Sequence, residues 1–165
     1  MSSLTFMGVR HVGLIAKNPA ALAAFYRDIM GMTVVGESPV GSPAGASLFL
    51  SAHPEEEDHE IVFFDTPAFA HTAFKVASLG ELLTAYRQVK ERGLPIKMAL
   101  NHGCSLAFYF DDPEGNMIEL YWATRLPIRQ PYGHPIDLDA PEEELLRDVE
   151  RVAQQFGLQP PPTLS

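Results

Sequence analysis

The amino-acid sequence predicts an α+β fold of two tandem β-α-β-β-β modules, followed by a C-terminal strap and a final helix. Two observations predict it. Apolar runs and turn formers follow the same order twice, and a histidine opens each repeat, His11 first and His71 60 residues later (71 − 11). Tyr26 and Tyr86 each follow their histidine by 15 residues (26 − 11 and 86 − 71). Because one such unit leaves a sheet face bare, we expect the two copies to pair and bury it.

The first module is expected over residues 7–66, with His11 set among apolar side chains of its first strand. Asn18 is a good N-cap and Pro19 suits the first helical position, so a helix begins there, and Gly31 ends it. The expected elements are a strand over residues 7–16, a helix over 20–30 and strands over 32–36, 46–51 and 61–64.

The second module, residues 68–124, repeats this order. Its last two strands form a hairpin, because residues 112–116 between them are dense in turn formers. The final strand holds Glu119 among residues that favour burial. An unpaired buried carboxylate costs several kcal/mol, so Glu119 is expected to meet a cation. The expected elements are a strand over residues 70–77, a helix over 79–92 and strands over 94–99, 105–110 and 117–122.

Residues 125–165 differ in composition from the two modules and are expected to form a strap and a helix. The proline-rich segment 125–141 is typical of an extended strap over the surface. Asp139 or Ala140, with Pro141 and the glutamates that follow it, opens a last helix. Its apolar stripe is expected to dock onto its own domain or onto a second subunit. The stripe consists of Leu145, Leu146, Val149, Val152 and Phe156.

Composition narrows the class of protein. With 165 residues, 46% hydrophobic and 20% charged, the chain is expected to form one globular, cytoplasmic domain. A net charge of −9 disfavours nucleic acid or an anionic membrane as a partner. No apolar run reaches the length of a membrane span, and the N-terminus lacks the features of a signal peptide. The single cysteine, Cys104, excludes an internal disulfide and suits a reducing compartment.

Two histidines and one glutamate are predicted to meet in a central groove. In a duplicated unit the first strands lie near the pseudo-twofold axis, so His11 and His71 take equivalent positions. Glu119, on the last strand of the second half, can reach the same groove. Either histidine taken alone also fits a half-buried, hydrogen-bonded role. Together, two imidazoles and one carboxylate form the ligand set of non-haem Fe(II) oxygenases, with Mn(II) as the alternative metal.

The stretch from His102 to Glu119 resembles the signature of the type I extradiol catechol dioxygenases, within the vicinal oxygen chelate superfamily (glyoxalase, bleomycin resistance, dioxygenase). The signature residues are His102, Phe108-Tyr109, Asp112-Pro113, Gly115 and Glu119. The resemblance spans residues 7–124 and is to the compact, one-domain kind. It implies one vicinal-oxygen-chelate domain over residues 1–165, with a curved mixed sheet around a central metal groove.

The resemblance also implies an activity and a role for each site residue. It implies Fe(II)-dependent ring cleavage of a catechol-type aromatic diol, with both atoms of O₂ incorporated. It assigns the acid–base role to His59, and contacts with the substrate oxygens to His102 and Tyr109. Histidine titrates near neutral pH, which suits a residue that must exchange a proton with a metal-bound diol.

Alternative functions and roles remain open from the sequence. The same fold hosts glyoxalase-like isomerases or lyases and metal-free binding proteins. Metal isomerases of this superfamily generally need another carboxylate on the last strand of the first half, where Val62 stands and Glu60 lies near the end. The alternatives place His59 in a surface ion pair, His102 in a turn and Tyr109 in the core.

The strap and the final helix raise two more expectations. A strap over the groove could contribute a lid residue, for which His134 is the candidate, although a structural role fits it as well. The apolar final helix and the exposed strand edges suggest a homodimer or a higher homo-oligomer.

Overall fold

The first half of the chain folds as a strand, a helix and three further strands. The helix begins after Asn18, whose side chain accepts a hydrogen bond from the Ala21 amide at 3.0 Å. It ends at Gly31, which adopts a left-handed conformation with a φ of 69°. The elements are β1 (Phe6–Ile15), α1 (Pro19–Met30), β2 (Thr33–Ser38), β3 (Ser47–Ser51) and β4 (Ile61–Phe64).

The second half repeats this order after a short 3₁₀ turn. Its helix is capped by the Ser78 side chain, which accepts from the Glu81 amide at 3.2 Å. Asp112 closes the last hairpin, since its Oδ1 accepts the amides of Glu114 and Asn116 at 2.9 Å each. The elements are η1 (Pro67–Phe69), β5 (His71–Val76), α2 (Leu79–Glu91), β6 (Ile96–Asn101), β7 (Ser105–Asp111) and β8 (Met117–Ala123).

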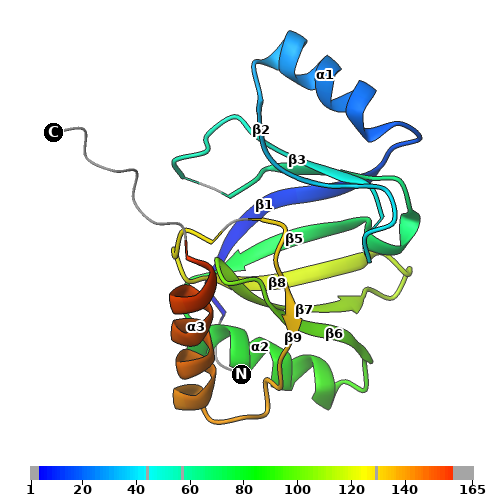
Figure 1. The fold of residues 1–165 in the computed structure, drawn as a ribbon. Coiled ribbons are helices and arrows are strands. Elements are labelled where there is room, and N and C mark those ends of the chain that lie inside the picture. The colour runs from blue at the N-terminus through cyan, green and yellow to red at the C-terminus, as the bar shows by residue number, and fades with distance from the viewer. Residues whose placement is uncertain (1–3, 44, 57, 129, 158–165) are drawn as a thin grey trace, which may run out of the picture.

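All strands join one mixed sheet that curls into a half-barrel (Figure 1). The computed structural model describes residues 4–43, 45–56, 58–128 and 130–157. The strand order is β2-β3-β4-β1-β5-β8-β7-β6-β9, where β9 is His134–Pro135 of the strap. β1 and β5, the first strands of the two modules, pair antiparallel at the junction, while β1–β4 and β5–β8 are parallel. The α+β fold with a curved mixed sheet is thereby confirmed.

Part of the C-terminal strap joins the sheet, and the final helix begins later than expected. The short strand β9 of the strap pairs antiparallel with β6 at the edge of the sheet. The helix α3 spans Glu142–Phe156 with Pro141 at its N-cap and no side-chain cap. Asp139 instead binds the Lys90 ammonium and accepts from the Tyr86 hydroxyl at 3.4 Å. A contact with another helix therefore replaces the cap.

The helices α2 and α3 pack on the second module, while α1 lies at the opposite end of the molecule (Figure 1). Leu145, Val149 and Val152 of α3 are buried, whereas Leu146 and Phe156 stay exposed. Leu145 and Val149 belong to a hydrophobic cluster that includes the buried face of α2. The apolar stripe therefore docks in part onto its own domain. None of the helices in the described ranges has the length and apolar character needed to cross a membrane.

Candidate active site

His11, His71 and Glu119 meet at the junction of the two modules, from β1, β5 and β8. The Nε2 atoms of His11 and His71 lie 3.0 Å apart, and Oε2 of Glu119 lies 3.0 Å from each of them. Donors bound to one ion at right angles, with bonds of about 2.1 Å, are about 3.0 Å from one another. The three atoms thus have the spacing of one face of an octahedral metal site.

Burial and charge suit these residues to a cation. His11 is 7% exposed and Glu119 only 3%. Burial alone would raise the pKa of Glu119, but His11 and His71 hold that pKa well below its ordinary value. Burial would lower the pKa of His71, whereas the hydrogen bond and charge of Glu119 raise it. The result is a buried carboxylate anion beside two imidazoles, a donor set that fits a divalent metal ion.

The turn between the modules orients His71. Its Nδ1 donates to the carbonyl of Phe69 at 2.6 Å, and a carbonyl can only accept, so the proton sits on Nδ1. In the neutral ring Nε2 is then the nitrogen without a proton, and this atom, which faces His11 and Glu119, is the one that a metal ion would bind. Gly13 on the neighbouring strand makes room, because a Cβ there would lie 2.9 Å from Nδ1 of His71.

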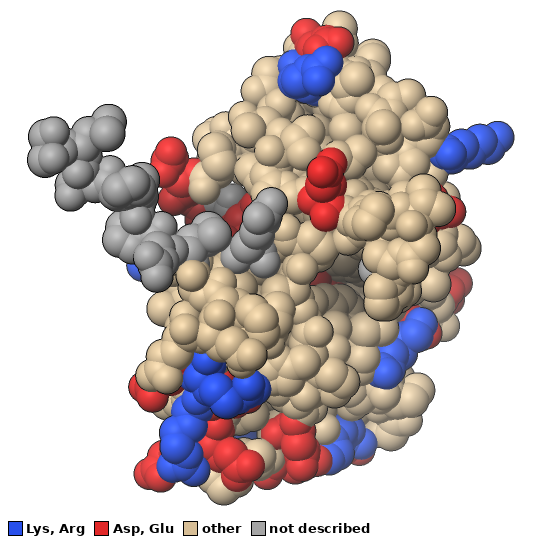
Figure 2. All heavy atoms as spheres, in the orientation of Figure 1, with Lys and Arg blue, Asp and Glu red and all other residues tan. Residues whose placement is uncertain are grey.

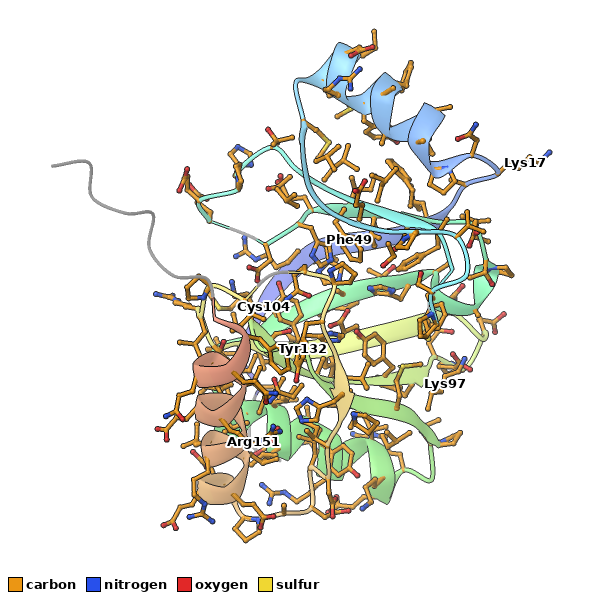
Figure 3. All side chains as sticks on the ribbon, viewed as in Figure 1. Lys17, Phe49, Lys97, Cys104, Tyr132 and Arg151 are labelled. Carbon is orange, nitrogen blue, oxygen red and sulfur yellow. The ribbon has the colours of Figure 1, made fainter. Side chains whose placement is uncertain are left out.

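A cavity of about 380 Å³ opens beside His11, His71 and Glu119. Its walls come from both modules, with Phe49 of β3 on one side and Tyr132 of the strap on another (Figure 3). Figure 2 shows that this face of the molecule is hollowed near its middle and that mostly uncharged side chains border the hollow. Aromatic and sulfur-containing side chains dominate the apolar lining: Phe49, Phe64, Phe69, Met98, Met117, Tyr121 and Tyr132. Such a cavity suits a flat, apolar molecule.

His59 reaches the cavity just before β4 begins. Its ring centroid lies 4.2 Å from that of His11 and 5.1 Å from that of Phe49. Its Nδ1 is buried and has no hydrogen-bond partner among the described residues. Burial, with a further contribution from His11, lowers the pKa of His59 well below its ordinary value. The surface ion pair considered for His59 is made by a different histidine, His53, whose Nδ1 lies 3.0 Å from Oε1 of Glu60.

His102 and Tyr109 form a pair on the opposite wall. The Tyr109 hydroxyl lies 3.1 Å from Nε2 of His102. Tyr109 pairs with Glu119 across β7 and β8, and its ring centroid lies 5.7 Å from that of His71. Burial, and then the charge of Glu119, raises the pKa of Tyr109 well above its ordinary value, so the hydroxyl keeps its proton. The structure therefore brings all six predicted site residues to one cavity.

Four strap residues on the cavity wall were not singled out by the sequence: Gln130, Pro131, Tyr132 and Gly133. His134, the candidate lid residue, does not line the cavity. Its Nδ1 lies 3.0 Å from the Tyr132 hydroxyl and its Nε2 2.7 Å from Oδ2 of Asp148, which fits the structural role. The proline-rich composition predicted a covering strap, but no local pattern distinguishes residues that face the cavity from their neighbours.

Comparison with curated proteins finds two related dioxygenases. The chain is 32% identical over 122 residues to biphenyl-2,3-diol 1,2-dioxygenase 3 of Rhodococcus globerulus, covering 67% of this chain and 60% of that protein. It is 31% identical over 77 residues to biphenyl-2,3-diol 1,2-dioxygenase 2 of the same organism, covering 40% of each. The chain thus spans at most about three fifths of the length of these relatives.

Solved structures share the fold at lower identity. A catechol 2,3-dioxygenase structure superposes with a TM-score of 0.63 at 19% identity, over 83% of this chain and 50% of that one. The Mn(II)-bound glyoxalase of Novosphingobium aromaticivorans gives a TM-score of 0.54 at 22% identity, over 73% of this chain and 40% of that one. Residues 8–120 of the sequence also match the model of one protein family. The chain belongs to the Glyoxalase/Bleomycin resistance protein/Dioxygenase superfamily.

Proposed function

We propose that this chain is an extradiol ring-cleavage dioxygenase that acts on a catechol-type aromatic diol with O₂. The observation that carries the proposal is the facial set of His11, His71 and Glu119 at the wall of an aromatic-lined cavity. The curated relatives, named biphenyl-2,3-diol 1,2-dioxygenases, support the same class of reaction. We propose Fe(II) as the metal, with Mn(II) as the alternative.

The proposed metal would be held by Nε2 of His11, Nε2 of His71 and a carboxylate oxygen of Glu119. When bound, it would lower the pKa of a catechol hydroxyl and conduct electrons from the ring to O₂. The apolar walls of the cavity, among them Phe49 and Phe64, would hold the ring and exclude water.

The chain itself would supply proton transfer and orientation. His59 would accept or deliver a proton at Nδ1, because that atom is buried beside His11 and unpaired. Nε2 of His102 would accept a hydrogen bond from a substrate hydroxyl, and the Tyr109 hydroxyl beside it would hold the substrate oxygen. Proximity to the three proposed ligands and the family resemblance support these three roles.

The sheet register supports a three-ligand site over a four-ligand isomerase site. Ala73 pairs with Glu119 in the second module, and Gly13, 60 residues before Ala73 (73 − 13), pairs with Val62 in the first. Val62 thus occupies the position equivalent to Glu119. Glu60, the carboxylate nearest to Val62 in the sequence, does not line the cavity and is bound to His53. Within the described ranges, the metal-binding group comprises only three residues, which leaves positions for a diol and O₂.

Metal analysis and a catechol panel test the proposal. Anaerobic purification should yield about one iron per chain, and catechols should give a yellow ring-fission product. Glu119→Ala should weaken metal binding more than about 100-fold. His59→Ala should keep the metal and lower kcat by about 100-fold or more. His53→Ala, which changes an exposed histidine outside the cavity, is the matched control and should behave as the unmodified chain. Zinc or nickel with isomerase activity, or full activity of both site variants, would overturn the proposal.

A further inference from the structure

The strap is fastened to α3 through one carboxylate, that of Asp148. Its Oδ2 accepts hydrogen bonds from Nδ2 of Asn101 at 2.8 Å and Nε2 of His134 at 2.7 Å. Its Oδ1 accepts from the exposed guanidinium of Arg151, with Nε at 3.2 Å. One oxygen atom therefore joins α3, the end of β6 and the strap.

The two partners of Oδ2 lie on segments that flank His102. Asn101, which is fully buried, directly precedes it, and its Oδ1 accepts the Gly103 amide at 2.7 Å. His134 pairs with Asn101 in the sheet. Because a carboxylate only accepts, His134 donates through Nε2 to Asp148, so its Nδ1 can accept from the Tyr132 hydroxyl at 3.0 Å. Asp148 is thus hydrogen-bonded both to Asn101, the residue before His102, and to His134 of the strap.

Two strap groups hold His102 directly. The Tyr132 carbonyl lies 2.7 Å from Nδ1 of His102, and Nε2 of Gln130 donates to the His102 carbonyl at 2.9 Å. A carbonyl only accepts, so His102 carries a proton on Nδ1. In the neutral ring Nε2 is then an acceptor, and it faces the Tyr109 hydroxyl and the cavity. The fit is close, because a Cβ at Gly133 would lie 3.2 Å from Nδ1.

We propose that Asp148 is a positioning residue for His102. By tying the strap to the end of β6, it keeps the Tyr132 carbonyl on Nδ1 of His102 and leaves Nε2 as the acceptor that faces the Tyr109 hydroxyl and the cavity. Asp148 on α3 accepts from His134, and His134 accepts from the Tyr132 hydroxyl. The backbone carbonyl of Tyr132 in turn accepts from Nδ1 of His102. The effect of Asp148 on catalysis through His102 rests on the proposed function. The tautomer of His102, by contrast, can be observed whatever reaction the chain catalyses.

Imidazole nitrogen spectra test the tautomer without any activity measurement. The full chain, labelled with ¹⁵N and free of paramagnetic iron, should show His102 with its proton on Nδ1. Asp148→Asn removes the charge and replaces one carboxylate oxygen with an NH₂ donor, which weakens the hydrogen bonds from Asn101 and His134. Part of the His102 population should therefore shift to the Nε2-protonated form. Arg151→Ala, which removes only the exposed partner of Asp148, is the matched control and should keep the original spectrum. An unchanged His102 spectrum in folded Asp148→Asn would overturn the proposal.

A second variant covers the case in which Asp148→Asn does not fold. Tyr132→Phe removes only the hydroxyl that binds His134, while the carbonyl and the ring contact with Phe156, at 4.9 Å between centroids, remain. It should shift the His102 tautomer in the same direction and to a smaller extent. If both variants fold and neither moves the tautomer, the chain of hydrogen bonds does not position His102.

A double-mutant cycle tests the catalytic consequence. Asp148→Asn should lower kcat for catechol cleavage by about tenfold or more, with Arg151→Ala unchanged. In a His102→Ala background, Asp148→Asn should add no further loss, because its effect passes through His102. An equal additional loss in that background would contradict the positioning role. If the unmodified chain cleaves no catechol yet the tautomer shifts as expected, the proposed function fails and the positioning role stands.

Discussion

Val62 of the first module stands at the register position that Glu119 holds in the second. It is fully buried and lines the cavity. Its methyl groups cannot bind a metal, so the first module supplies only one of the proposed ligands, His11, while the second supplies two. The open side of the proposed metal site follows from this difference.

Val62→Glu should therefore convert the site to four protein ligands. Without metal, a second buried carboxylate near Glu119 should lower stability by about 3 kcal/mol or more. Zn(II) or Mn(II) should restore the melting temperature, and ring cleavage should be lost because a position needed by substrate or O₂ is filled. Thermal melts with and without metal check this. Val62→Gln, of similar size and without charge, is the control, and a metal response equal to that of the glutamate variant would contradict the prediction.

At the scale of single helices and strands, the sequence predicts what local signals determine and misses what depends on contacts between distant residues. Elements with local signals were predicted within about two residues, as with the helix opened by Asn18 and Pro19. The two histidines were paired from the internal repeat, that is from their spacing and the order of the elements around them, and the structure brings them together. By contrast, Asn101 and Asp148 meet across 47 residues, and no periodicity or turn pattern announces such a contact. The late start of α3 has the same cause, because Asp139 binds α2 instead of capping its own helix.

The β7–β8 turn should make stability depend on acid pH. Hydrogen bonds from the Asn116 side chain, at 2.9 Å, and from nearby amides lower the pKa of Asp112 below its ordinary value. Since the folded-state pKa is below the unfolded one, the stabilisation is complete above about pH 5 and is lost as pH falls through the folded-state pKa. Asp112→Ala should thus be less stable than the unmodified chain at pH 7, with the difference shrinking toward pH 3. Urea unfolding across this range measures it, and a difference that stays constant with pH would refute the assignment.

The helix α3 offers a paired test of how its stripe docks. Val152 is fully buried, whereas Leu146 on the same helix is 38% exposed. Val152→Ala should cost about 2 kcal/mol, because it leaves a cavity under the helix. Leu146→Ala should change stability by no more than about 0.5 kcal/mol. Equal losses, measured by urea unfolding, would mean that Leu146 is also covered in solution, as by a second subunit. The homo-oligomer expected from the sequence remains a prediction, and the comparison of these two variants tests it.

At the scale of the whole molecule, the two modules share one sheet and divide the proposed ligands between them. β1 carries His11 and pairs directly with β5, which begins with His71. The modules are thus coupled by hydrogen bonds along the junction and by the electrostatics of the ligand group. We expect the described residues to behave as one domain.

A metal titration of thermal unfolding tests that coupling. The chain should unfold in one transition by far-UV and near-UV circular dichroism. Mn(II) at about 1,000 times its Kd should add about 4 kcal/mol to stability, raising the whole transition. Glu119→Ala should show no such increase. Two separate transitions, of which metal raises only one, would show that the modules unfold independently.

The turn between the modules has a consequence for dividing the chain. Phe69, whose carbonyl orients His71, follows Thr66 in the sequence, as does His71 itself. A cut between residues 65 and 66 would leave His11 on one fragment, and His71 with its carbonyl partner and Glu119 on the other. Neither fragment alone would hold three ligands. The ion would then act as the link in fragment complementation, and metal concentration would set how much of the protein reassembles.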